Sequence, residues 1–277
     1  MKIGAHVSAA VSLDLSFERA KNIQAECTQI FISPPQQWLK VKHSDEVVEK
    51  YKAAQKTSGI EPNFIHGTYL INLATPILEH WEKSIDWLNY AMEVAAKIES
   101  TGVIFHVGSH KGKGFDTVKD KVVKAISKIL KDSEGTPTYL ILENTAGGGG
   151  SIGKFAELGY LIKGLNHPRL KVCLDTQHAF AAGYDLKDNL NQVIEQFDKE
   201  IGLDNLIAIH ANDSKPALGS NTDRHENIGE GMIGIEAWKK IVNHPKLKDL
   251  PFILEVPGFA NIGPDIENVK ILKKLTH

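Results

Sequence analysis

Short apolar runs alternate with longer amphipathic segments along the whole chain. Eight apolar runs have the length of strands, at residues 2–7, 25–32, 61–66, 102–106, 138–143, 170–175, 205–210 and 251–256. Apolar positions at helical spacing predict helices at residues 13–24, 44–57, 76–99, 116–131, 152–165, 188–201, 234–243 and 265–275. This strict alternation predicts an α/β fold with a parallel sheet, a single-domain (β/α)₈ TIM barrel that spans residues 1–277.

Composition agrees with this fold. The chain has 277 residues, of which 42% are hydrophobic and 24% charged, as in soluble globular proteins with a large core. It has no apolar run of ~18 residues, so we expect no membrane span, and its first residues lack the apolar region of a secretion signal. Cys27 and Cys173 lie in apolar strand-like runs. We expect buried thiols rather than a disulfide, which favours a cytoplasmic protein.

The stretch from His210 to Gly231 holds the densest group of candidate metal ligands. A histidine ends the apolar run at residues 206–209, and Asp213, Asp223 and His225 follow in a loop rich in Gly, Ser, Asn and Asp. We expect this loop to lie outside the core because it is so polar. A carboxylate and an imidazole two residues apart suit a divalent cation of the zinc type.

Six consecutive predicted strands end on a residue type that binds zinc. The C-terminal ends of barrel strands meet at one mouth, so these six side chains could share a site with His178, Asp223 and His225, which we expect in the loops that follow. The nine candidate ligands are His66, His106, Glu143, Asp175, His178, His210, Asp223, His225 and Glu255. A lone histidine or carboxylate is most often structural, but several buried carboxylates together require cations. Nine ligands exceed the four of one tetrahedral zinc, so we expect more than one ion.

Three long motifs closely resemble the endonuclease IV family of abasic-site (AP) endonucleases. They are HGTYLINLA at 66–74, VCLDTQHAFAAGYD at 172–185 and HANDSKPALGSNTDRHENIGEG at 210–231, and the resemblance runs from GAHVSAA at 4–10 to LEVPG at 254–258. It implies a zinc-dependent endonuclease of base excision repair. Such an enzyme hydrolyses the DNA phosphodiester 5′ to an abasic site and leaves a 3′-hydroxyl and a 5′-deoxyribose phosphate. We also expect 3′-end-cleaning phosphodiesterase activity.

The resemblance further implies three zinc ions per chain, for which Mn²⁺ could substitute. The implied ligand sets are His66, His106 and Glu143 for the first ion, Glu143, Asp175, His210 and Glu255 for the second, and His178, Asp223 and His225 for the third. Glu143 is the candidate catalytic residue because it would bridge two ions and orient the attacking water. A net charge of −2 argues against a DNA partner. Three Zn²⁺ ions would make that total positive and concentrate the charge in the pocket.

The resemblance also implies contacts with double-stranded DNA that contains abasic sites. Tyr69 and Leu70 match family residues that enter the minor groove, although they could instead pack beneath their loop. Gln36 stands where some members have a groove-inserting arginine, which predicts weaker or more salt-tolerant binding. Arg224, between two candidate ligands, is expected to contact a phosphate. We expect a monomer without a membrane partner.

Three other functions are compatible with parts of the sequence. The run GGGSIGK at residues 148–154 nearly matches a phosphate-binding P-loop, but Phe155 replaces its Ser/Thr, so we expect no nucleotide cofactor. A sugar isomerase or epimerase would use the same barrel with one or two metals and fewer ligands. A third alternative is a protein that binds damaged DNA without cutting it.

His6 and His110 lie near the predicted mouth, and we expect them to support the site or the fold.

Overall fold

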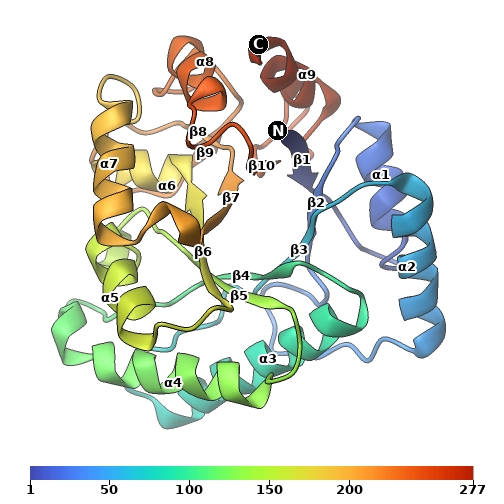
Figure 1. Cartoon of the computed structure of the whole chain (residues 1–277), viewed down its shortest axis with the longest axis vertical. Helices are drawn as coiled ribbons and strands as arrows, with labels where there is room; N and C mark the ends of the chain where they lie inside the picture. Colours follow the sequence, from blue (N-terminus) through green and yellow to red (C-terminus); the bar gives the residue numbers. More distant parts are fainter. Residues whose placement is uncertain (277) are drawn as a thin grey trace.

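The computed structural model describes residues 1–276, which form a closed barrel of eight parallel strands (Figure 1). Around the barrel the strands follow the order β1-β10-β7-β6-β5-β4-β3-β2. Their bounds are β1 Lys2–His6, β2 Thr28–Ile30, β3 Asn63–His66, β4 Gly102–His106, β5 Tyr139–Glu143, β6 Leu170–Asp175, β7 Leu206–His210 and β10 Pro251–Leu254. The predicted TIM barrel is therefore confirmed.

Helices surround the barrel on its outer side (Figure 1). The helices at the predicted places are α1 Leu15–Asn22, α2 Asp45–Ser58, α3 Leu78–Lys97, α4 Lys119–Asp132, α5 Phe155–Leu165, α7 Leu190–Glu200, α8 Ile235–Asn243 and α9 Ile266–Leu275. Each begins one to three residues after the start that the sequence predicts. None of the helices within residues 1–276 is long and apolar enough to cross a membrane.

The structure adds short elements that the sequence pattern did not predict. Helix α6, Thr176–Ala181, follows β6 directly, and β8, Asp213–Ser214, pairs antiparallel with β9, His225–Glu226. Three 3₁₀ turns also occur, at Phe115–Thr117, Gly148–Gly150 and Leu203–Asn205. Each element is too short to show a periodicity of its own. Both α6 and the β8–β9 pair lie at the barrel mouth.

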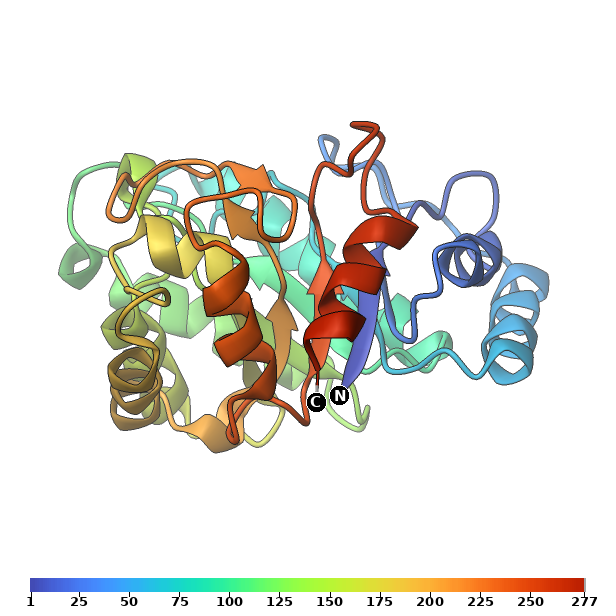
Figure 2. The same ribbon diagram turned by 90° about the horizontal axis from the view of Figure 1, so that it is seen from above.

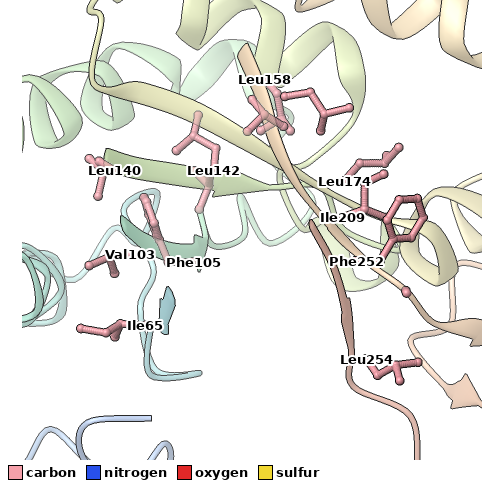
Figure 3. Packing of buried hydrophobic residues seen from close by; sticks show 14 of the residues in the cluster. Ile65, Val103, Phe105, Leu140, Leu142, Leu158, Leu174, Ile209, Phe252 and Leu254 are labelled. Carbon is pink, nitrogen blue, oxygen red and sulfur yellow. The ribbon is translucent and has the colours of Figure 1, made fainter. Parts of the chain in front are cut away.

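The strands alternate between two apolar layers. Residues that face outward pack against the helices, as Figure 3 shows for Val103 and Phe105 on β4 beside Leu140 and Leu142 on β5. Residues that face inward fill the barrel, and they are Cys27, Phe64, Ile104, Ile141, Cys173, Ala208 and Ile253. Both cysteines are buried free thiols, as predicted. On β1 the inward place is taken by Gly4, where a Cβ would lie 2.4 Å from the sulfur of Cys27.

The next inward-facing position on each strand lies at the mouth. Because side chains alternate along a strand, this position comes two residues after the apolar layer. Six strands place candidate ligands there, namely His66, His106, Glu143, Asp175, His210 and Glu255, and the other two place His6 and Gln29. Figure 2 shows the strand-to-helix loops of this end at the top, opposite the two chain termini. The fold thus brings polar side chains from all eight strands into one ring.

Candidate metal centre

Most of the candidate ligands lie at the C-terminal ends of strands, and they differ in how deeply they are buried. Five strands end on a ligand, and Glu255 follows the last residue of β10. Glu143, Asp175 and His210 are fully buried, whereas the side chain of Glu255 is 15% exposed. The prediction that His178 lies in a loop was wrong, because it lies in α6. Asp175 begins that helix, and its Oδ1 accepts the backbone N–H of His178 at 2.8 Å.

Around Glu143 the structure brings together the first predicted ligand set. Oε2 of Glu143 lies 3.2 Å from Nε2 of His66 and 3.5 Å from Nε2 of His106. The other oxygen, Oε1, lies 2.9 Å from Nδ1 of His210. Each oxygen of the Glu143 carboxylate therefore faces a different group of histidines.

The second and third sets lie beside the first. Nδ1 of His210 is 3.3 Å from Oε2 of Glu255 and 3.8 Å from Oδ2 of Asp175. Oδ1 of Asp223 lies 3.3 Å from Nε2 of His178 and 3.4 Å from Nε2 of His225.

Ligand atoms gather in three groups, each within 4.8 Å: His66, His106 and Glu143; Glu143, Asp175, His210 and Glu255; and Asp175, His178 and His225. The third group differs from the implied set because it contains the buried Asp175 in place of Asp223. The exposed carboxylate of Asp223 lies near the same two histidines.

Several of these separations match the spacing of ligand atoms around one zinc ion, although Nδ1 of His210 lies at hydrogen-bond distance, 2.9 Å, from Oε1 of Glu143. Ligand atoms about 2.05 Å from a tetrahedral zinc stand roughly 3.4 Å apart. The pairs of His66 and His106 with Glu143, and of His178 with Asp223, lie at 3.2–3.5 Å. Hydrogen bonds of nitrogen to oxygen are usually shorter, at about 2.9 Å. The mixture of imidazole and carboxylate donors also suits zinc.

The carboxylates of the centre have no lysine or arginine partner among residues 1–276. Glu143, Asp175, Asp223 and Glu255 form ion pairs with histidines alone. Buried carboxylates need a compensating charge. Without metal, only protonated imidazoles can supply that charge.

The proton affinities follow from this arrangement. Burial alone would raise the pKa of Glu143, but His106, His210 and His178 hold it well below its usual range. Burial would lower the pKa of His178, yet the carboxylates of Asp175, Asp223 and Glu143 raise it well above 6.5. The pKa of His210 is likewise raised well above 6.5 despite burial. The carboxylates and the imidazoles of the centre therefore stabilise each other's charged forms.

Hydrogen bonds fix the direction in which four of the imidazoles present a lone pair. Nδ1 of His66 contacts the carbonyl of Gly67 at 2.8 Å, and Nδ1 of His178 contacts that of Asn144 at 3.0 Å. Nδ1 of His225 contacts the carbonyl of Glu255 at 3.1 Å. A carbonyl can only accept, so in each of these three rings Nε2 is left to bind metal. His210 is held by a side chain instead, through Gln29.

Several supporting residues were missed by sequence reasoning. Asn144 accepts the backbone N–H of Asp175 at 2.7 Å and donates to its carbonyl at 3.0 Å. Asn212 donates to Oδ2 of Asp175 at 2.7 Å and accepts the N–H of Glu255 at 2.8 Å. Asn144 directly follows the strand-end ligand Glu143, and Asn212 comes two residues after His210. Their place beside these ligands is the signal that could have revealed them.

The prediction that the loop after His210 lies outside the core was wrong for its first residues. Asp213 is fully buried, and its carboxylate accepts five N–H groups, from Ser214, Gly229, Ile233, Gly234 and the indole of Trp238. Burial nevertheless raises the pKa of this carboxyl. The loop approaches so closely that a Cβ on Gly231 would lie 2.4 Å from Oδ1 of Asp213. Asp213 therefore organises the loop and does not face the metal centre.

A cavity of about 510 Å³ opens above the centre. It is lined by His66, Tyr69, His106, His178, Lys215, Asp223, Arg224, His225, Glu226, Glu255, Pro257 and Asn261. Tyr69 and Leu70 are 59% and 36% exposed, so neither packs beneath its loop. Gln36 and Arg224 are exposed as well. A larger cavity of about 900 Å³ adjoins the first and shares Tyr69, His225 and Glu255 with it.

The model of the xylose isomerase-like TIM barrel family matches residues 17–275 of this chain. A protein of Halothermothrix orenii named probable endonuclease 4 is 43% identical over 278 residues, which cover 99% of this chain and 100% of that protein. A protein of Methanosphaerula palustris, also named probable endonuclease 4, is 38% identical over 281 residues, which cover 99% of this chain and 98% of that protein.

Among solved structures, endonuclease IV from Thermus thermophilus is similar with a TM-score of 0.88 and 34% identity, over 99% of this chain and 98% of that one. A D-tagatose 3-epimerase-like protein has a TM-score of 0.75 at 21% identity, over 99% of this chain and 97% of that one. This second likeness shows the fold alone.

Proposed function

This chain belongs to the endonuclease IV family of nucleases, and from that premise we propose that it hydrolyses the DNA phosphodiester on the 5′ side of an abasic site with zinc as its cofactor. The products are a 3′-hydroxyl and a 5′-deoxyribose phosphate. The observation that carries this proposal is the convergence of nine candidate metal ligands at one mouth, whose carboxylates have no lysine or arginine partner among the described residues.

The first two ions would be held by two groups that share Glu143, and the third by His178 and His225 with Asp223 or Asp175. Bound zinc supplies a nucleophile at neutral pH by lowering the pKa of a water molecule. Glu143 lies between the first two groups, where its carboxylate can orient the attacking water. Arg224 and Lys215 line the cavity above, where they can bind the DNA phosphates.

The rim residues support an abasic substrate. An abasic nucleotide has no base to stack or pair, so its extrusion from the duplex costs less than that of a normal nucleotide. Tyr69 and Leu70 expose apolar surface beside the cavity, and such side chains can open a kinked minor groove. The N–H of Tyr69 donates to the carbonyl of Pro35 at 2.9 Å, which joins this loop to the one with Gln36.

Sugar isomerisation is the weaker alternative. Proteins named as epimerases share the barrel, but their likeness at 21% identity or below concerns the fold alone. An aldose or ketose site with one or two metals would not need the rim ligand Asp223. About three zinc ions per chain would favour the nuclease, and one or two would favour the isomerase.

The deciding experiment uses a duplex with one tetrahydrofuran abasic analogue. Zinc-loaded protein should nick it on the 5′ side and leave an end that a DNA polymerase extends, and 1,10-phenanthroline should abolish the nicking. Binding without nicking would indicate a damage-binding protein. Nicking that resists the chelator would contradict zinc catalysis.

A further inference from the structure

Two members of the ring at the barrel mouth are not in the ligand set. His6 on β1 and Gln29 on β2 occupy the inward position that carries a candidate ligand on the other six strands. The two residues are also direct neighbours in the register of β1 and β2. Gln29 is fully buried, although a glutamine side chain is rarely buried without a specific partner. Its burial therefore points to specific contacts within the ring.

Gln29 uses both ends of its amide within the ring. Its Oε1 lies 2.8 Å from Nε2 of His210. Its Nε2 donates to Oε1 of Glu255 at 2.6 Å and lies 2.9 Å from Nδ1 of His6. One side chain thus contacts two candidate ligands of the same ion, His210 and Glu255.

Chemistry fixes which way this amide faces. An ionised carboxylate only accepts hydrogen bonds, so the NH₂ group of Gln29 must face Glu255. The amide oxygen then faces His210 and can only accept, which requires a proton on Nε2 of that ring. Nδ1 of His210 is left with its lone pair directed at Glu143, Asp175 and Glu255.

We propose, on the basis of the function above, that Gln29 is a positioning residue of the metal centre. It holds His210 in the tautomer that binds metal through Nδ1, and it holds the carboxylate of Glu255 at the same ion. His6 completes the arrangement, because its Nδ1 lies 2.9 Å from the amide nitrogen of Gln29 and 3.3 Å from Oε1 of Glu255. Gln29 touches no reacting atom and acts through these two ligands.

The orientation of His210 depends on a side chain, in contrast to that of three other imidazoles of the centre. His66, His178 and His225 are oriented by backbone carbonyls, which no substitution removes. The orienting group of His210 is a side chain and can be deleted. Loss of such a partner typically lowers metal affinity by about 10- to 100-fold. The effect should fall on the ion held by Glu143, Asp175, His210 and Glu255.

The test compares two variants with the zinc-loaded wild type. Gln29→Met keeps the length of the side chain and removes its hydrogen bonds. Gln29→Glu keeps an acceptor for Nε2 of His210 but cannot donate to Glu255. Thr28→Val is the matched control, because Thr28 is equally buried on the same strand and its hydroxyl donates outward to Asn63 at 2.6 Å.

Zinc affinity is measured by titration against a competing chelator, and the coordinated nitrogen of His210 by ¹⁵N NMR of the imidazoles. We expect Gln29→Met to bind one zinc about 10- to 100-fold more weakly and to lose the Nδ1-bound signature of His210. Gln29→Glu should retain that signature, and Thr28→Val should change neither quantity. Wild-type zinc affinity and an unchanged His210 spectrum in Gln29→Met would overturn the proposal.

These readouts are independent of DNA cleavage. A wild-type protein that binds three zinc ions but does not nick abasic DNA would refute the proposed function and leave the role of Gln29 standing. If Gln29→Met does not fold, loss of the His210 signature in folded Gln29→Glu would overturn the proposal, and its retention would support it.

Discussion

Oε1 of Glu143 lies 2.9 Å from Nδ1 of His210, and both side chains are fully buried. The second oxygen of the same carboxylate faces His66 at 3.2 Å. Glu143 is thus shared by two of the groups of ligand atoms at the mouth, as is Asp175, which the second group shares with the third. A carboxylate in this place can hold two ions at a fixed separation, and the proposed chemistry depends on that bridge.

Glu143→Gln should preserve the fold and remove most of the activity. The amide keeps the shape of the side chain but loses the negative charge and one metal-binding oxygen. We expect kcat on tetrahydrofuran DNA to fall by about 10³-fold or more, as measured by single-turnover nicking.

The matched control for this variant is Glu195→Gln on the exposed surface of α7, which should nick at the wild-type rate. Circular dichroism should show native folding of both proteins. Near-normal cleavage by Glu143→Gln would refute the role of the bridge.

Asp213→Asn should destabilise the protein and loosen the loop that carries Asp223 and His225. The carboxylate accepts five N–H groups, and an amide would present an N–H to some of them. We expect the free energy of unfolding to fall by about 3 kcal/mol, measured by urea denaturation. Asp185→Asn, which removes a carboxylate that also accepts N–H groups but lies near the surface, should cost less than about 1 kcal/mol. Equal losses in the two variants would contradict the special role of Asp213.

The sequence predicted the barrel and the strand ends well because both depend on local, repeated patterns. The apolar runs were long enough to show their period, and six of them ended on a histidine or a carboxylate that parallel pairing brings to the same edge. His66, His106, Glu143, Asp175 and His210 therefore end their strands as expected. Their assignment to particular ions stays a prediction from family resemblance.

Contacts between residues distant in sequence could not be predicted. Nothing local links Gln29 to His210, which lies 181 positions away. The burial of Asp213 was missed because a polar loop usually lies outside the core, and its five N–H donors become visible only when the loop is folded. Helix α6 was missed because six residues are too few for a helical period, although Asp175 followed by His178 matches a helix cap.

Gln36→Arg should tighten DNA binding at low salt. Gln36 is exposed in the loop after β2, which contacts the Tyr69 loop at the cavity rim. One added phosphate contact should make the slope of the logarithm of the DNA association constant against the logarithm of the salt concentration more negative by about 0.9. Fluorescence anisotropy with abasic duplex DNA measures this slope. The control Gln192→Arg adds the same charge on α7 and should change the slope less. An equal slope in the wild type and in Gln36→Arg would count against a DNA contact at residue 36.

Metal-free protein should lose stability as the pH rises above about 6.5. The folded-state pKa values of His178 and His210 are raised, so their protonated forms stabilise the fold below the unfolded value of 6.5. That contribution disappears as the pH rises through the raised values and leaves buried carboxylates without counter-charge. Zinc binds neutral imidazole, so its stabilising effect should grow over the same range. Thermal melts of stripped and zinc-loaded protein from pH 6 to 8 would test both trends, and a metal-free Tm that rises over this range would contradict them.

Nine side chains at the barrel mouth are expected to hold three zinc ions, and the proposed chemistry depends on these ions. The most direct measurement is an anomalous difference map recorded at the zinc absorption edge from crystals of the zinc-loaded protein. We expect three peaks, one against His66 and His106, one against His210 and Glu255, and one against His178 and His225. A single peak, or no peak within bonding distance of these residues, would contradict the account.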